Sequence, residues 1–206
     1  MDKSTEMHEL RERLELIESM IQEGRRKTES WGWTFLLWGA AYFVAIFWAS
    51  WGNGSLSMWG HNAVAWPVTM IVAAALTTLI GIRMDSGHPH TTLGRAAISL
   101  WIAVGVSMIL IFPALATSGR LDVHLFVALV GTMLGTANGA SALMLKWKIQ
   151  FGCAVVWWAI SVAACFVSDA QLTVLFLLAL FLCQIVFGVY AMTREARRRK
   201  LGAAHA

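Results

Sequence analysis

The sequence predicts an all-α membrane protein with six transmembrane helices, arranged as three antiparallel hairpins with both termini in the cytoplasm and preceded by a cytoplasmic amphipathic helix. Hydrophobic residues make up 58% of the 206 residues, and the mean hydropathy of +0.63 is far above that of soluble domains. Six apolar runs are each close to the roughly 20 residues that cross a bilayer. They cover residues 31–51, 62–82, 96–117, 121–145, 150–168 and 171–192.

Basic residues predict the orientation of these runs. Of the 16 Lys and Arg residues, all but Arg120 fall before the first run or after the second, fourth or sixth. Cytoplasmic loops carry the excess of Lys and Arg, so both termini are expected in the cytoplasm and the connections at 52–61, 118–121 and 169–170 outside. We expect a multi-pass protein of the bacterial inner (cytoplasmic) membrane, whose basic residues contact membrane lipids and not nucleic acid.

The runs divide the chain into three parts. Residues 1–30 are expected to form a cytoplasmic amphipathic helix, residues 31–192 the six-helix transmembrane bundle, and residues 193–206 a basic cytoplasmic tail. Within the first part, apolar residues alternate at spacings of three and four, which is the a/d pattern of a coiled coil over two heptads. This heptad seam consists of Met7, Leu10, Leu14, Ile17 and Ile21.

The seam has two interpretations. One is a helix that lies on the membrane surface or against the protein's own cytoplasmic loops. The other is self-association into a homo-oligomer, or docking of another protein. The polar face is acidic as far as Glu23, whereas a helix lying on a membrane normally carries Lys and Arg there, which favours contact with protein.

Three glycines in the fourth run predict close helix packing. Gly131, Gly135 and Gly139 form two overlapping G-x-x-x-G steps, and such a surface lets a second helix approach closely. The spacing leaves open whether that helix belongs to the same chain or to a second copy. Because a six-helix bundle needs a tightly packed centre, we favour packing within the chain.

Polar residues within the runs also have two interpretations. They are Thr77, Thr78, Thr132, Thr136, Asn138 and Gln184. Such side chains commonly hydrogen-bond between transmembrane helices. Alternatively, they line a path for a small neutral or weakly charged solute. The centres of the runs contain no Asp, Glu, Lys or Arg, which disfavours an ion-coupled pump but leaves a channel or facilitator open.

The sequence offers little for catalysis. Asp85, His88 and His90 form a weak candidate metal cluster, but Gly87 and Pro89 mark an ordinary turn there. The three cysteines fall within apolar runs and are expected to pack as small apolar residues. Without acid and base groups that converge on a cavity, we expect no catalytic residue, no metal and no cofactor, and a protein that is not an enzyme.

The beginning of the chain combines a charged helix, a basic cluster and a Trp- and Gly-containing apolar segment. It runs from Leu16-Ile17-Glu18-Ser19-Met20-Ile21 through Arg25-Arg26-Lys27 to Gly32-Trp33-Thr34-Phe35-Leu36-Leu37-Trp38-Gly39. These roughly forty residues resemble the opening of a group of uncharacterised bacterial multi-span membrane proteins, which place a short charged helix before a Trp-Gly first span. The resemblance implies the boundary between cytoplasmic helix and membrane, and it brings no known activity.

These observations favour a regulatory or scaffolding inner-membrane protein that associates through its cytoplasmic heptad helix and its Gly-rich fourth span. The alternative is a channel or facilitator for a small neutral or weakly charged solute, lined by polar residues of spans 2, 4 and 6.

Overall fold

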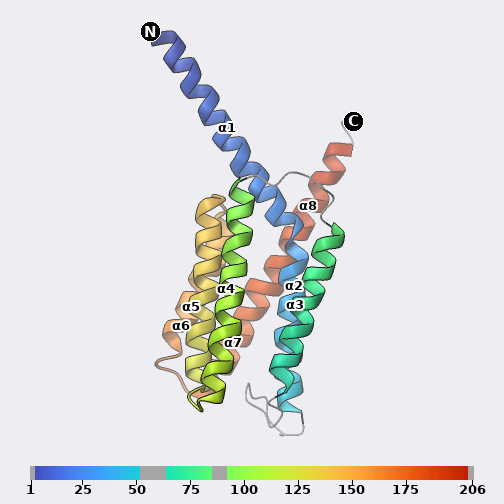
Figure 1. Ribbon diagram of the computed structural model, residues 1–206, viewed down its shortest axis with the longest axis vertical. Coiled ribbons are helices and arrows are strands. Elements are labelled where there is room, and N and C mark those ends of the chain that lie inside the picture. The colour runs from blue at the N-terminus through green and yellow to red at the C-terminus, as the bar shows by residue number, and fades with distance from the viewer. Residues whose placement is uncertain (1–2, 52–63, 85–91, 204–206) are drawn as a thin grey trace.

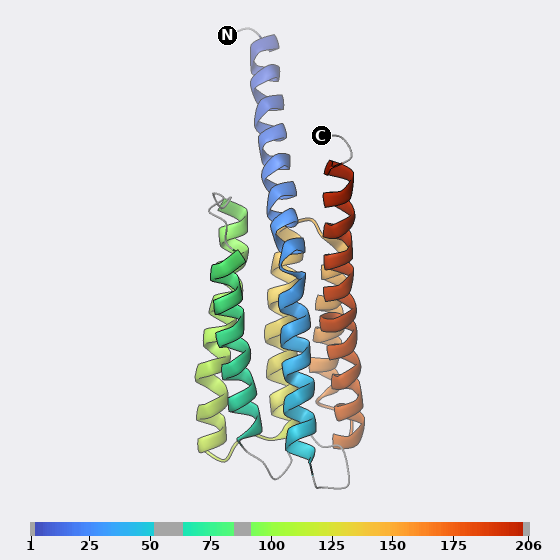
Figure 2. The same cartoon turned by 90° about the vertical axis from the view of Figure 1, so that its right-hand side faces the viewer.

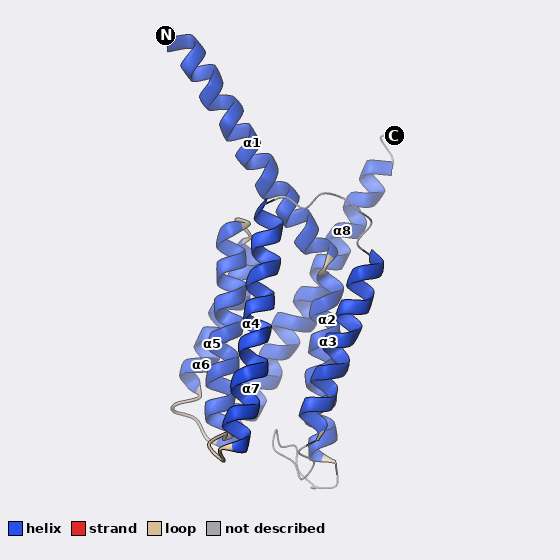
Figure 3. Ribbon diagram, viewed as in Figure 1, coloured by secondary structure: helices blue, strands red, loops and turns tan. Residues whose placement is uncertain are grey.

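The structure is a computed structural model that describes residues 3–51, 64–84 and 92–203. These residues form helices joined by short connections and include no strand, so the predicted all-α class is confirmed (Figure 3). In chain order the elements are α1 (Lys3–Ser30), α2 (Gly32–Ser50), α3 (Ala65–Met84), α4 (Thr92–Thr117), α5 (Val123–Met144), α6 (Lys148–Ala163), α7 (Asp169–Leu180), the π-helical segment η1 (Phe181–Val186) and α8 (Phe187–Ala203).

Five helical segments are long and apolar enough to cross a membrane, which indicates a membrane protein. They are Gly32–Ser50, Ala65–Arg83, Leu93–Thr117, Val123–Met144 and Asp169–Arg198. The fifth of them unites α7, η1 and α8 into one continuous helix. This helix runs past the expected bundle boundary at residue 192, so the basic residues predicted as a tail lie on α8 as far as Ala203.

The predicted span over residues 150–168 is wrong in its extent. The corresponding helix, α6, has 16 residues and ends at Ala163, which gives a length of about 24 Å. The chain must turn before α7, and the backbone N–H groups of Cys165 and Phe166 already bond to carbonyls only three residues earlier. Ser168 caps the start of α7 and donates its backbone N–H to Gln171 Oε1 at 3.1 Å.

The helices form a bundle (Figures 1 and 2), and aromatic side chains meet at its centre. Phe176 of α7 makes edge-on ring contacts with Tyr42 of α2, Phe126 of α5 and Trp157 of α6, at centroid distances of 6.1, 6.0 and 5.9 Å. Such pairs contribute about 0.5–1.5 kcal/mol beyond the area they bury. The core is therefore built by α2, α5, α6 and α7 together with η1 and α8.

Two helices lie at the edge of this core. Residues 98–117 of α4 include no buried residue, and Ile109 and Leu110 are each more than two-thirds exposed. Ile71 of α3 is exposed to a similar degree. Aromatic contacts hold both helices to the core, through Trp66 with Phe126 at 5.0 Å and Trp101 with Phe35 at 5.7 Å. Outward apolar faces of this extent suit helices that face lipid.

The first helix leaves the bundle. Figure 1 shows α1 projecting beyond the end where α3 finishes and α4 begins, and α8 emerges at the same end. We call this the upper end, and the end with the connection at residues 118–122 the lower end. Gly24 is buried where α1 meets the bundle: a Cβ there would lie 3.0 Å from Leu145 and 3.6 Å from Leu93. A small residue at Gly24 thus allows α1 to approach α4 closely.

Candidate functional site

The heptad seam on α1 is uncovered over most of its length. Met7, Leu10, Leu14 and Ile17 are 61, 58, 60 and 52% exposed, whereas Ile21, nearer the bundle, is half-buried. The charged residues around the seam interact along their own helix, as Arg13 does with Glu9. An apolar stripe that remains exposed on a projecting helix is typical of a protein contact surface.

The glycine surface of α5 is occupied by α6 of the same chain. A Cβ on Gly131 would lie 2.9 Å from the carbonyl oxygen of Trp157. On Gly139 it would lie 2.8 Å from the ring of Trp158, and on Gly135 it would collide with the same ring. The three glycines therefore let α5 and α6 pack at backbone distance, with Trp158 lying over two of them.

A second glycine contact was not predicted from the sequence. Gly32 and Gly39 of α2 face the helix formed by η1 and α8: a Cβ on Gly32 would lie 3.0 Å from Gly188 O, and one on Gly39 would lie 2.9 Å from Gln184 Cβ. The seven-residue spacing of Gly32 and Gly39 was a signal that both lie on one helix face. It could not reveal a partner about 150 residues away in the sequence.

The polar residues predicted to line a solute path lie in different environments. Asn138 and Gln184 are buried, at 0 and 3% exposure, whereas Thr78, Thr132 and Thr136 are exposed. Three of the hydroxyls bond to the carbonyl four residues earlier on their own helix, an ordinary arrangement for threonine in apolar helices. They belong to Thr77, Thr78 and Thr132.

Thr132 also joins two helices. Its Oγ1 lies 2.7 Å from Ser161 Oγ, and Ser161 donates to Ala128 O at 2.7 Å. This hydrogen-bonded group connects α5 to α6 beside Gly131. Thr132 therefore contributes to the contact between these helices.

Three polar residues of the α5–α6 hairpin are buried in the core, and we call them the buried polar cluster. Asn138, Ser141 and Gln150 are fully buried. Asn138 Nδ2 donates to Leu134 O at 2.9 Å, but Asn138 Oδ1, Ser141 Oγ and both amide atoms of Gln150 make no hydrogen bond within the described part of the chain. Each buried polar group without a partner costs about 1–3 kcal/mol. These buried groups therefore keep unused hydrogen-bonding capacity.

Gln150 was missed because it stands at the start of a predicted run. A signal was nevertheless present, since Trp147, Gln150, Ala154 and Trp157 recur at spacings of three and four and all prove buried. This spacing places Gln150 on the inward face of α6. The contact of Gly139 with Ala154 sets the register of the hairpin and puts Ser141 and Gln150 at nearly the same level.

A histidine connects three segments at the lower end of the bundle. His124 of α5 places Nδ1 2.6 Å from Ala164 O and Nε2 2.8 Å from Asp169 Oδ1. Beside it, Asp122 caps α5 by accepting the Leu125 backbone N–H at 2.7 Å. The imidazole thereby ties the start of α5 to the connection between α6 and α7.

The cysteines occupy two environments. Cys153 and Cys183 are buried together, and Cys183 Sγ donates to Cys153 O at 3.8 Å. Cys165 is exposed just beyond the end of α6. The residues of the weak metal cluster, Asp85, His88 and His90, lie outside the described residues. Among the residues described, no group of three or more His, Cys, Asp or Glu side chains could hold a metal ion.

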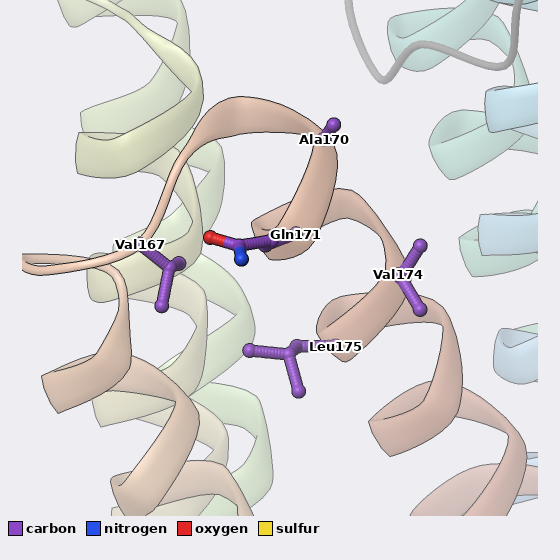
Figure 4. Close-up of a pocket in the computed structure, with 5 residues that line it drawn as sticks. All are labelled: Val167, Ala170, Gln171, Val174 and Leu175. Carbon is purple, nitrogen blue, oxygen red and sulfur yellow. The ribbon is translucent and has the colours of Figure 1, made fainter.

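One hollow in the described surface is also unsuited to acid–base chemistry. It has a volume of about 490 Å³ and lies between α7 and the connection before it (Figure 4). Its lining is Val167, Ala170, Gln171, Val174 and Leu175. The polar member, Gln171, accepts hydrogen bonds from Ser168 through Oε1. The hollow therefore presents an apolar surface without an acid, base or nucleophile.

The chain matches no protein-family model, no curated protein and no solved structure. Two features with functional potential stand out from the geometry: the exposed seam on α1, and the buried polar cluster of the α5–α6 hairpin.

Proposed function

We propose that this protein is a non-enzymatic, regulatory or scaffolding protein of the bacterial inner membrane, and that it associates through the heptad seam of α1. One observation carries the proposal: four of the five seam residues are more than half exposed on a helix that projects from the bundle. Apolar burial of about 25 cal/mol per Å² makes an exposed stripe of this kind favourable to cover.

In this proposal the chain crosses the membrane six times, with both termini in the cytoplasm. The basic side of the bundle supports the orientation, because Arg83, Arg95, Lys146 and Lys148 all belong to the upper end, where α1 and α8 emerge. Arg120 belongs to the lower end. The short α6 is one of the six spans, and local thinning of the bilayer accommodates such a helix at modest cost.

Cys165 provides a native reporter of this topology. It is exposed at the lower end, whereas Cys153 and Cys183 are buried. A membrane-impermeant maleimide added outside intact cells or spheroplasts should label the wild-type chain but not Cys165→Ser. Labelling only after the membrane is opened would place the lower end in the cytoplasm and overturn the orientation.

Association is assigned to α1 and not to the fourth span. The glycine surface of α5 already contacts Trp157, Trp158 and Ser161 of α6. A second copy could reach these glycines only by displacing α6. In this proposal the bundle anchors the protein in the membrane and fixes the direction in which α1 projects.

A pair of matched substitutions tests the seam. Leu14 and Leu16 are the same residue type and are 60 and 62% exposed, but only Leu14 belongs to the seam. Leu14→Asp should abolish association of the purified protein in detergent, measured as mass by light scattering, and Leu16→Asp should leave it unchanged. Equal losses, or no loss in either variant, would refute the role of the seam.

A second candidate function is facilitated passage of a small neutral or weakly charged solute. The buried cluster of Asn138, Ser141 and Gln150 favours it, because these side chains keep unused hydrogen-bonding capacity within the bundle. Flux of glycerol or urea into liposomes should then fall in Asn138→Leu and persist in Thr78→Val, whose side chain is exposed. Equal flux in wild type, Asn138→Leu and empty liposomes would rule out this path.

A further inference from the structure

The residues beside the seam carry a charge pattern of their own. With Met7, Leu14 and Ile21 at a, and Leu10 and Ile17 at d, the flanking g positions hold Glu6, Arg13 and Met20, and the flanking e positions hold Arg11 and Glu18. All four charged side chains are exposed. In coiled coils the e and g positions select the partner and its orientation.

In a parallel, in-register pair, each g residue meets the e residue five positions later on the other helix. Glu6 would thus meet Arg11 of the second helix, and Arg13 would meet Glu18. Both pairs are opposite in charge, and symmetry repeats them on the other side of the seam. Building on the proposed function, we propose that the partner of the seam is a second copy of this chain, joined by a parallel, in-register coiled coil of α1.

The other acidic residues between Glu6 and Glu23 fit the same arrangement. Glu9, Glu12, Glu15 and Glu23 occupy heptad positions c, f, b and c, on the outside of such an assembly. The surplus negative charge is therefore kept away from the contact. The e and g positions next to the seam carry balanced charge, and there each sign meets its opposite.

The bundle determines the direction of pairing. Trp31 is the only residue between α1 and α2, and Gly24 is held against Leu93 and Leu145. Two copies inserted in one membrane with the same orientation therefore project their α1 helices in the same direction, as Figure 2 shows for one copy. The charges alone would also allow some antiparallel registers. The attachment of α1 to the bundle excludes these registers and permits the parallel arrangement.

The test exchanges charges between two full-length chains. Arg13→Glu alone sets a carboxylate against the carboxylate of Glu18 in the second copy. Glu18→Arg alone sets a guanidinium against that of Arg13, so each variant repels itself. Mixed together, the two variants can form pairs in which opposite charges meet on one side of the seam and on the other.

The readout of this exchange is the composition of the complexes. With different affinity tags and co-reconstitution in nanodiscs, mixed complexes should exceed self-complexes by about tenfold at low salt. Each substitution also changes interactions within its own helix. These changes affect mixed complexes and self-complexes equally, so they do not alter the ratio between them. Equal amounts of mixed and self-complexes would contradict the predicted pairing.

A crosslink provides the readout of register. In a Cys165→Ser background, Leu10→Cys places the new cysteine opposite itself in a parallel, in-register pair, whereas Ser19→Cys at position f points outward. Oxidation should crosslink the first variant and not the second. If Leu14→Asp abolishes association but mixing gives no preference and Leu10→Cys does not crosslink, the partner is not a parallel second copy, although the seam still functions. If the wild-type chain shows no association through the seam, the proposed function fails as well.

Discussion

The glycines of this bundle differ in the atoms that a Cβ at each position would contact. A Cβ on Gly131 would meet the main-chain carbonyl of Trp157 at 2.9 Å, an atom that can give way only if α5 and α6 separate. The ring of Trp158 faces Gly135, but this side chain is 37% exposed and can rotate outward. Gly152, in the same hairpin, has no heavy atom within 4 Å of its Cβ position apart from its chain neighbours and its own helix backbone. The same substitution should therefore have graded effects along one helix pair.

We expect Gly131→Ala to be the most destabilising of these alanine substitutions. Overpacking costs about 1–3 kcal/mol, and in a chain of this size each kcal/mol shifts the melting temperature by about 2–4 °C. Gly152→Ala is the control and should leave the melting temperature unchanged or raise it, because alanine is the better helix former. Thermal unfolding in detergent measures both. Equal effects at the two positions would show that the backbone contact is not formed.

Gln150 provides a second test at the scale of single residues. Its amide is fully buried, and both polar atoms lack a partner within the described residues. Replacing such a group by an apolar residue of similar size removes an unmet desolvation cost, so Gln150→Leu should match or exceed the wild-type melting temperature. Gln150→Ala is the size control and should lower it through the cavity it leaves. A clear loss of stability in Gln150→Leu would reveal hydrogen bonds to molecules within the core.

Individual residues were predictable to different degrees. The spacing of Gly131, Gly135 and Gly139 predicted close packing, because small residues on one face of a helix allow another helix to approach that face. The identity of the partner depends on tertiary arrangement, so α6 could not be derived. Gly188 belongs to no glycine motif, and its packing role follows only from its contact with Gly32 in the structure.

At the scale of elements, helix ends were harder to predict than helices. The apolar run over 150–168 continues through the turn after Ala163, because hydropathy does not distinguish an apolar turn from an apolar helix. The turn also has a structural attachment, since Ala164 O accepts from His124. A connection that is fixed by contacts to α5 and α7 can be predicted only when the positions of those helices are known.

The histidine contact predicts coupling between two elements. His124→Ala and Asp169→Ala should each lower the melting temperature, because each removes a hydrogen bond between the start of α5 and the start of α7. The double variant should lose less than the sum of the two single losses, since partners in contact are not additive. Thermal unfolding of all four chains gives the coupling. Strict additivity would show that the two side chains do not interact, and Arg120→Ala serves as a nearby control outside the contact.

At the scale of the whole molecule, the chain separates into a bundle and a projecting helix. The aromatic centre draws on Tyr42, Phe126, Trp157 and Phe176, none of which lies on α1. The contact of α1 with the bundle involves its last turns, where Gly24 meets Leu93 and Leu145. From the sequence we predicted a division near residue 30, because charge and heptad spacing in the first 30 residues differ from the apolar runs. The sequence could not predict how far α1 projects, which depends on where the bundle ends.

This separation predicts that assembly and folding can be uncoupled. A chain lacking residues 2–22 should still insert into the membrane and melt within about 2 °C of the full chain, since little of the buried core is lost. The same chain should behave as a monomer in detergent, because its exposed seam residues are gone. Light scattering and thermal unfolding of one preparation measure both properties, and Leu14→Asp should reproduce the monomeric mass with all residues present. Persistent association of the shortened chain would move the interface onto the bundle, where the exposed apolar sides of α3 and α4 are the remaining candidate surfaces.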